Sequence, residues 1–401
     1  MAAAAGAARA PFYPTISVES INGYQRLVDL VPKHWGTLKT WQNRSAVSLD
    51  YDLIDFGRRD SQAASALNRM IAANLLFNRK IQEVVFEVER AFYRVDAAQA
   101  GVEAAKATVK LASSDLRDAE RRQHHGLATR PAVLLARQRD AQAEYDFENA
   151  KLAVNLAQAD LALALGVRAD RVPEVGPLKD QPLPKSLGED VDRLIDAALH
   201  DRPDLAADAS TLRARQAAVE LAHAALYPTF GLTSFYGEEA FNYRLSNPLT
   251  PTYTALAPEY GAGLTLKWEL FTGLSRINSI RQTEAERNQA RAELTSAELD
   301  VAAEVWRAYY SYVTAKRKYD YAQALLAASQ SSYDSNARSY GRGIATIIDL
   351  LSAERALALA RFTIIQSKAE LLISAAGVRF ALGAIPEAGP RPVPFAATRS
   401  P

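Results

Sequence analysis

Residues 81–119 read IQEVVFEVERAFYRVDAAQAGVEAAKATVKLASSDLRDA and carry a seven-residue repeat. One position of the repeat is always a valine, isoleucine or leucine, and the position three residues later is a valine once and then alanine. The first set is Ile81, Val88, Val95, Val102, Val109 and Leu116, and the second set is Val84, Ala91, Ala98, Ala105, Ala112 and Ala119. Alternating spacings of three and four are typical of helices packed as a left-handed coiled coil. The alanines predict that a partner helix approaches closely.

Long stretches without proline surround this pattern. No proline occurs from Arg58 to Arg130, so we expect one helix from about Arg58 to Gln123, roughly 100 Å long. A second proline-free stretch, from Gly273 to Ile385, carries a seam that includes three tyrosines. Its polar and aromatic members indicate that part of this helix faces something wetter than a closed core, although tyrosine stripes are more often packing. The seam is Val301, Val305, Ala308, Tyr312, Ala315, Tyr319, Ala322, Leu326, Ser329 and Tyr333.

Each long helix is predicted to end in a glycine-containing turn and to be followed by a second helix. The turns are HHGLATRPAV (124–133) and YGRGIATIIDL (340–350), and the second helices run to about Leu165 and Leu382. Gly126 and Gly343 supply the left-handed backbone conformation that such turns need. The sequence therefore predicts two antiparallel helical hairpins.

Strand patterns precede each long helix. In AVSLDYDL (46–53) and GLTLKWEL (263–270), apolar residues alternate with polar ones, which is typical of a β-strand with two different faces. Earlier partners are expected at 15–21 and 229–236, so each long helix is preceded by a β-hairpin. Strands of about ten residues, apolar outside and polar inside, are what a membrane-spanning barrel uses.

The chain is two copies of this unit. A shift of 217 residues lays 49–166 on 266–383 without a gap, and a shift of 214 lays Tyr13-Pro14-Thr15 on Tyr227-Pro228-Thr229. We therefore expect a first repeat over 1–166, a connector over 167–200, a second repeat over 201–385 and a proline-rich tail over 386–401. The fold class predicted is mainly α with a small β part.

Composition and motifs exclude several classes of function. Lys and Arg (47) nearly balance Asp and Glu (46), which argues against binding to nucleic acid. The chain has no cysteine, and it lacks nucleophile-elbow, Walker-type and HExxH patterns. We therefore predict that it is not an enzyme and that it has no cofactor and no metal site. The pair His124-His125 could bind metal or sense pH, but an exposed pair at a turn is more often simply solvated.

Two interpretations from different classes fit the pattern. A soluble coiled-coil scaffold would use the long helices, but it would not need aromatic residues such as Tyr51 and Trp268 alternating with charges. A membrane protein would need both the strands and the helices. Four strands per chain cannot close, and open sheet edges are not tolerated in lipid, so several copies would have to pool their strands.

Particular motifs resemble those of the TolC-like outer-membrane efflux proteins. They are RPDL (202–205), YPT (13–15 and 227–229), WELFTG (268–273) and YGRGIATIIDLLSA (340–353), and together they span nearly the whole chain. The resemblance implies a homotrimer with a twelve-stranded barrel in outer-membrane lipid and an α-helical tunnel across the periplasm. It also implies a periplasmic adaptor and an inner-membrane pump of the RND or ABC type as partners. Drug efflux, metal efflux and polypeptide secretion all remain open.

The resemblance also implies a gate at the second turn. Tyr340 and Asp349 match the family's gating tyrosine and its first acidic position, and Arg342 lies close to where an arginine tether often sits. Ala345 stands at the tether position itself, and Ser352 replaces a second acidic residue. We therefore predict a pore gate formed by Tyr340, Arg342, Asp349 and Ser352. The alternative is that Tyr340 and Asp349 are solvated turn residues.

The beginning of the sequence departs from the family pattern. Residues 203–226 are expected to form a helix that leads into the second copy's strands, whereas only a dozen residues precede Tyr13. We expect in-frame coding sequence upstream of Met1 that encodes this helix and a secretory signal.

Overall fold

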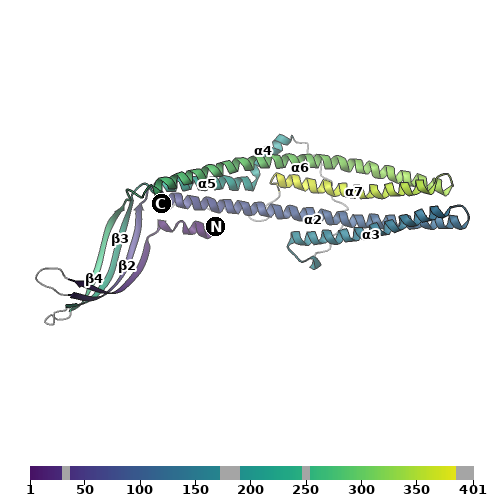
Figure 1. Cartoon of the computed structure of the whole chain (residues 1–401). Helices are drawn as coiled ribbons and strands as arrows, with labels where there is room; N and C mark the ends of the chain where they lie inside the picture. The colour runs from purple at the N-terminus through teal and green to yellow at the C-terminus, as the bar shows by residue number, and fades with distance from the viewer. Residues whose placement is uncertain (29–36, 172–189, 246–252, 385–401) are drawn as a thin grey trace, which may run out of the picture. The chain divides into compact units, whose positions relative to one another are not determined.

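A computed structural model describes residues 1–28, 37–171, 190–245 and 253–384. Each copy of the repeat forms a β-hairpin followed by a helical hairpin, as predicted (Figure 1). The first copy comprises β1 (Thr15–Val28), β2 (Thr37–Ile54), α2 (Arg58–His124) and α3 (Arg130–Leu165). The second comprises β3 (Thr229–Leu245), β4 (Tyr253–Lys267), α6 (Ser275–Gly341) and α7 (Ile347–Ala381). The other elements are α1 (Ala2–Ala7), η1 (Ala10–Phe12), η2 (Ala169–Arg171), α4 (Val191–Asp201) and α5 (Pro203–Ala224).

The chain divides into two compact units. Unit 1 comprises Met1–Leu75 and Ala206–Ser296 and holds the sheet, and unit 2 comprises Leu76–Leu205 and Ala297–Pro401 and holds most of the two helical hairpins. The helices α2, α5 and α6 contribute residues to both units. The predicted connector includes η2 and α4, while its residues 172–189 and the predicted tail 386–401 lie outside the described residues.

The four strands of unit 1 form one antiparallel sheet in the order β1-β2-β3-β4. They contain 14, 18, 17 and 15 residues, so they are longer than the sequence predicted. The strands continue through polar pairs, such as Ser20 and Ser45 with hydroxyl oxygens 2.8 Å apart, which an apolar alternation does not reveal. The end of β4 was predicted wrongly. Trp268 and Leu270 lie beyond it, and the Trp268 indole instead donates a hydrogen bond of 3.1 Å to the Leu226 carbonyl oxygen.

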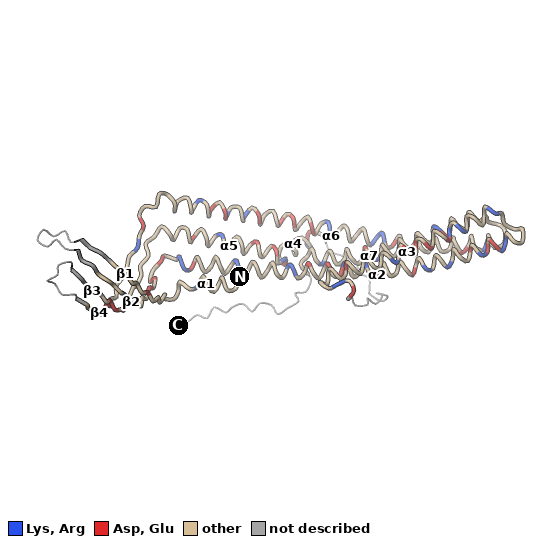
Figure 2. The backbone as a smooth tube through the Cα atoms, turned by 60° about the horizontal axis from the view of Figure 1, so that its bottom comes forward, with Lys and Arg blue, Asp and Glu red and all other residues tan. Residues whose placement is uncertain are grey.

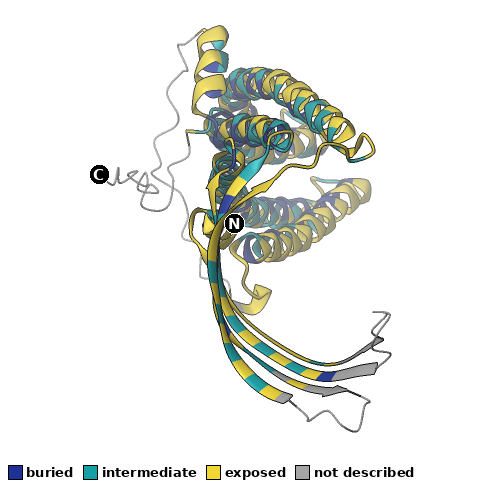
Figure 3. Ribbon diagram, turned by 90° about the vertical axis from the view of Figure 1, so that its left-hand side faces the viewer, coloured by how far each residue is buried: buried dark blue, intermediate teal, exposed yellow. Residues whose placement is uncertain are grey.

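The two faces of this sheet differ in chemistry. Val18, Val47, Tyr236 and Tyr260 pair in one row across all four strands, and each is at least 45% exposed. The residues next to them point to the opposite face, where Arg44 makes two hydrogen bonds of 2.8 Å to Glu259. Exposed and half-buried residues accordingly alternate over residues 41–48 of β2 and 254–261 of β4 (Figure 3). One face is therefore apolar and the other carries charges.

Both strand-to-helix junctions of unit 1 use two consecutive residues in the left-handed backbone region. These are Phe56 and Gly57 (φ 52° and 85°) in the first copy and Gly273 and Leu274 (φ 61° and 65°) in the second. A non-glycine residue in this region costs on the order of 1–3 kcal/mol. After the first junction, α2 is anchored by Asp55, whose carboxylate accepts hydrogen bonds from the backbone N–H (2.9 Å) and side chain (2.8 Å) of Arg59.

In unit 2, the predicted seams form part of the packing surfaces of the hairpins. In α2 four of the twelve predicted members, Ala91, Val95, Ala112 and Ala119, are at most 6% exposed, whereas Val84 is 45% exposed. In α6, seven of the ten predicted members are buried, including Tyr312 and Tyr333, so the tyrosines act as packing residues. The close approach predicted from the alanines is interrupted midway along α2, where Ala98 and Ala105 line a cavity.

The RPDL motif (202–205) connects α5 to neighbouring helices of unit 2. Arg202 is 4% exposed and donates hydrogen bonds to Asp204 (2.6 Å), Glu304 on α6 (2.6 Å) and the Ala381 carbonyl oxygen on α7 (3.0 Å). Leu205 packs beside it in a cluster with residues of α4 and α6. The motif is therefore a clasp that joins α5 to α6 and α7. Within the described residues, no helix carries an apolar stretch long enough to cross a membrane.

Candidate functional site

The two turns of unit 2 have the same backbone design. Gly126 (φ 71°) and Gly343 (φ 77°) are left-handed, as predicted. The next N–H group in each turn bonds back to the helix, from Leu127 to the Arg122 carbonyl oxygen (2.7 Å) and from Ile344 to the Ser339 carbonyl oxygen (2.9 Å). This is the Schellman arrangement that ends a helix with a glycine. It leaves the side chains of Leu127 and Ile344 more than 70% exposed.

Asp349 lies on the first turn of α7 and closes its N-terminus. The Asp349 carboxylate accepts hydrogen bonds from the Thr346 backbone N–H (2.9 Å) and hydroxyl (2.7 Å), and the Thr346 hydroxyl accepts one from the Asp349 N–H (3.3 Å). These bonds lower the pKa of the exposed carboxyl below its usual range. The first copy lacks this capping box, because Ala132 occupies the position equivalent to Asp349.

Tyr340 lies near the end of α6 and contacts the other hairpin of the same chain. The Arg122 guanidinium on α2 lies 4.5 Å from the centre of the Tyr340 ring, and its Nη2 donates a hydrogen bond of 2.9 Å to the Gly341 carbonyl oxygen. Burial raises the pKa of the Tyr340 hydroxyl, against the opposing effect of Arg122. Tyr340 is therefore a half-buried contact residue rather than a freely solvated one.

The remaining predicted gate residues are solvent-exposed. Arg342 lies at the start of the turn, and Ser352 follows Asp349 by three residues on the same face of α7. The structure thus brings Asp349 and Ser352 onto one exposed face, whereas Tyr340 packs between hairpins. The His124 and His125 rings, 5.5 Å apart, are also exposed. Among the residues that the structure describes, no group of three or more His, Cys, Asp or Glu is arranged to hold a metal ion.

Arginines outnumber acidic residues at the turns. Residues 121–130 and 338–349 include five arginines, and Asp349 is their one acidic residue. The arginines are Arg121, Arg122, Arg130, Arg338 and Arg342. Arg121 is paired with Asp118 one turn earlier in α2. Lys and Arg are marked along the hairpins in Figure 2. The turns therefore present a positively charged surface.

Sequence reasoning missed two polar contacts that lie deeper between the hairpins. Arg139 on α3 donates a hydrogen bond of 3.1 Å to Glu354 on α7, and the Tyr333 hydroxyl on α6 lies 3.5 Å from an Asp115 carboxylate oxygen on α2. All four residues are less than 10% exposed. One signal for Glu354 exists in the sequence, since this charged residue lies between Leu350 and Leu357 on the apolar stripe of α7.

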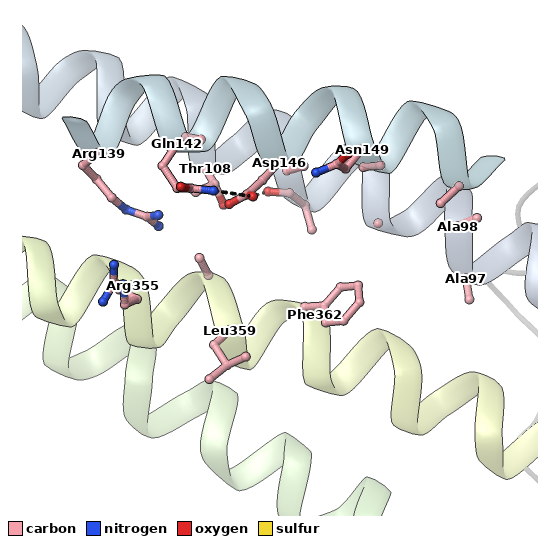
Figure 4. Close-up of a pocket in the computed structure, with 17 residues that line it drawn as sticks. Ala97, Ala98, Thr108, Arg139, Gln142, Asp146, Asn149, Arg355, Leu359 and Phe362 are labelled. Atoms are coloured by element: carbon pink, nitrogen blue, oxygen red, sulfur yellow. Dashed lines mark hydrogen bonds between the residues drawn. The ribbon is translucent and has the colours of Figure 1, made fainter. Parts of the chain in front are cut away.

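A cavity of about 620 Å³ adjoins this polar region. Its floor consists of small residues of α2, including Ala98, Gly101 and Ala105. Figure 4 shows Arg139 and Asp146 on α3 across the cavity from residues of α7. The α7 wall comprises Arg355, Ala358, Leu359 and Phe362. The two hairpins are therefore loosely packed against each other in this stretch.

Comparison with known proteins identifies the family. A sequence profile described as "Outer membrane efflux protein" matches residues 1–167 and 194–384. The chain belongs to the outer membrane efflux protein family. Two relatives are similar over most of the chain. Protein CyaE of Bordetella pertussis is 27% identical over 354 residues, covering 87% of this chain and 71% of the relative. Outer membrane efflux protein BepC of Brucella suis is 22% identical over 341 residues, covering 84% and 71%.

Solved structures of family channels share the fold. The outer-membrane channel OprN superposes with a TM-score of 0.83 at 20% identity, covering 95% of this chain and 84% of OprN. The outer membrane protein VceC of Vibrio cholerae gives 0.78 at 18% identity, covering 94% and 89%. This efflux protein is thus an outer-membrane channel and not an enzyme, which decides against the soluble coiled-coil scaffold.

Proposed function

We propose that the protein is the passive exit duct of a tripartite efflux or type I secretion system and works as a homotrimer. The observation that carries this proposal is the four-stranded sheet, in which β1 and β4 each pair with one neighbour among the described strands. The sheet also exposes an apolar row from Val18 to Tyr260. An exposed apolar face suits lipid, and lipid requires that each strand edge be paired.

Association of three chains satisfies this requirement. Three copies would pair each β1 with a neighbour's β4 and close twelve strands into one barrel, with the Arg44–Glu259 face toward the interior. The helical hairpins would extend the duct across the periplasm. The similarity to BepC, described as an outer membrane efflux protein, supports transport as the task of the assembled channel.

The turns are the surface on which we expect a periplasmic adaptor to dock. Leu127 and Ile344 are 75% and 77% exposed at equivalent positions of the two turns, so each turn offers an apolar side chain to a partner. The adaptor would link the channel to an inner-membrane pump of the RND or ABC type, which supplies the energy for transport. The arginines around these two residues favour an adaptor surface with acidic side chains.

We assign the gate of the duct to Tyr340, Arg342, Asp349 and Ser352. Support for this assignment differs among the residues. Asp349 and Ser352 share an exposed face of α7, where copies related by threefold symmetry would place their side chains around one axis. Tyr340 would act indirectly, by holding α6 against the first hairpin through Arg122.

Two measurements on the protein purified in detergent test this function. Native mass spectrometry should give a mass of three chains, and planar-bilayer recordings should show ion-conducting channels. A stable monomer that does not conduct ions would overturn the proposal. A matched variant, Val47→Arg, should impair insertion because the charge would lie on the apolar face, whereas Ser48→Arg on the opposite face should insert normally.

A further inference from the structure

Three sets of contacts join the two helical hairpins of one chain near the turns. The outermost is the contact of Arg122 with Tyr340 and Gly341. The other two are Asp115 with Tyr333 and Arg139 with Glu354. In each of them one residue belongs to α2 or α3 and the other to α6 or α7. These polar contacts lie beside an apolar cluster that also joins the hairpins and includes Ala132 and Leu357. They therefore add charge-dependent contacts to apolar packing near the turns.

In the contact of Arg139 with Glu354, one carboxylate oxygen has no hydrogen bond within the described ranges of the chain. Glu354 is 1% exposed, and only its Oε1 accepts a hydrogen bond from Arg139. Its second oxygen, Oε2, has no hydrogen-bond partner among the residues that the structure describes. A buried carboxylate oxygen without a donor is destabilising, whereas a protonated carboxyl group carries no charge that needs one.

The two carboxyl groups of Glu354 and Asp115 face a single positive charge among the described residues, that of Arg139. Asp115 is 8% exposed, and Arg139 is the single guanidinium bonded within this group. If both carboxyls ionise, the buried group carries one net negative charge. If one of them is protonated, the group is neutral.

We propose that Asp115, Tyr333, Arg139 and Glu354 form a proton-controlled tether that positions the two hairpins, and with them the gate residues at the turns. When one carboxyl group is protonated, the tether is neutral and the hairpins pack together. When both are ionised, the excess buried charge favours a state in which the hairpins separate and water reaches Glu354. The adjoining cavity, which Arg139 also lines, provides the space for that water. This inference rests on the proposed channel function.

The surroundings of Glu354 and Asp115 raise the pKa of both carboxyl groups toward neutral pH. Burial raises the pKa of Glu354 to about 7, with Arg139 opposing and Asp115 and Asp140 adding to the rise. Burial and Asp118 raise the pKa of Asp115 to about 6, against the hydrogen bond from Tyr333. Burial and the Asp115 and Glu354 carboxylates also raise the pKa of Tyr333, which therefore keeps its proton. The groups that face the tether come from all four helices: Asp115 and Asp118 on α2, Arg139 and Asp140 on α3, Tyr333 and Asp334 on α6, and Glu354 on α7.

The direction of the effect follows from these shifts. The pKa of Glu354 is higher in the packed state than its ordinary value of 4.5, so the packed state binds more protons than an open or unfolded one. The stability of the packed state is therefore greatest at low pH and falls as the pH rises from about 4.5 to about 7. The hairpins should be tightly packed in mildly acidic medium and looser at pH 8.

The test uses the assembled full-length channel and two independent measurements. Hydrogen exchange of the turn amides, residues 123–130 and 340–348, reports on hairpin packing, and planar-bilayer recording reports on opening. For the wild type we expect exchange, corrected for intrinsic rates, to accelerate about thirtyfold between pH 5.5 and 8, because about 1.5 of the pKa units between 4.5 and about 7 lie in this interval. Open probability should rise over the same interval.

Glu354→Gln carries a permanently neutral group of the same shape, so it should keep the slow exchange and low open probability of the wild type at pH 5.5 across this range. Asp115→Asn should likewise show a smaller change of exchange rate and open probability with pH than the wild type. Glu148→Gln is the matched control, because Glu148 is exposed on α3 and forms an ion pair with Lys151 on the same helix, and it should follow the wild-type profile. A Glu354→Gln profile equal to that of the wild type, or exchange that does not vary with pH in the wild type, would overturn the tether. Absence of conductance in the wild type as well as in the variants, with the exchange profiles as expected, would instead reject the proposed channel function.

Discussion

The Arg122 guanidinium lies 4.5 Å from the centre of the Tyr340 ring, and the two residues belong to different helical hairpins of one chain. The contact therefore involves the face of the ring rather than the hydroxyl group. This distinction matters for the gate, because replacing tyrosine by phenylalanine would preserve most of the interaction.

We accordingly expect Arg122→Ala to loosen the turns more than Tyr340→Phe does. The alanine variant loses the ring contact and the hydrogen bond to Gly341, together worth about 1–2 kcal/mol, while the phenylalanine variant keeps both. Single-channel conductance should rise in Arg122→Ala and change little in Tyr340→Phe. Arg117→Ala is the control, because the exposed Arg117 side chain donates its hydrogen bond within its own helix, to the Ser113 carbonyl oxygen. Equal conductance in Arg122→Ala and Arg117→Ala would contradict this prediction.

Asp349 should influence ion selectivity over a wide range of pH. Its pKa is lowered by the hydrogen bonds from Thr346, so the carboxylate and its capping box persist above the ordinary pKa and are lost only as the pH falls through the lowered value. Asp349→Asn should reduce the preference for cations at pH 5 and at pH 8 alike, as measured by reversal potentials in a salt gradient. Ser352→Ala, on the same face, should leave selectivity unchanged. Selectivity that is equal in the wild type and Asp349→Asn would place the constriction elsewhere.

The RPDL clasp should be sensitive even to a conservative replacement. Arg202→Lys keeps the charge but cannot donate to Asp204, Glu304 and the Ala381 carbonyl oxygen at once. We expect a loss of about 1.5–3 kcal/mol in unfolding free energy, because the half-buried carboxylates and the Ala381 carbonyl oxygen lose hydrogen bonds from the guanidinium. Thermal unfolding in detergent measures the effect, with exposed Arg168→Lys as the control. A change in melting temperature no larger than that of the control would show that the clasp is not stabilising.

The apolar row of the sheet gives a prediction about depth in the membrane. Tyr236→Arg should destabilise the channel by about 2–4 kcal/mol if its row lies at the bilayer midplane, and by about 0–1 kcal/mol if it lies near an interface. Tyr260→Arg occupies the same row on the next strand and should give the same value. Unfolding free energies in lipid vesicles test this, and a large difference between the two variants would mean that the row does not face lipid at a single depth.

Local patterns predicted the elements of this fold well. The seven-residue repeat of α2 and the seam of α6 depend on neighbours a few residues apart. They located both long helices, most of the packing face of α6 and part of that of α2. The glycines at 126 and 343 located both turns, because a left-handed residue is required there. The internal repeat predicted the order of elements, because the same succession of two strands and two helices could be recognised in both copies.

The contacts between hairpins could not be predicted in the same way. Arg139 and Glu354 are 215 positions apart, and their pairing depends on how two separate hairpins meet. Glu354 is equivalent to Arg137 under the internal shift, so the repeat gives no indication of this pair either. The strand ends were wrong for other reasons. The strands continue through polar residues that carry no apolar alternation, and after β4 the alternation continues through Trp268 and Leu270, which lie outside the strand.

The junctions at Phe56-Gly57 and Gly273-Leu274 bear on how the two copies of the repeat differ. Positions 56 and 273 are equivalent, as are 57 and 274, yet the glycine occupies the second position in one copy and the first in the other. The two copies therefore share the same backbone path, although the glycine best suited to it stands at different positions. Each copy tolerates one bulky residue in a left-handed conformation, so the path from strand to helix is more alike between the copies than the side chains that follow it.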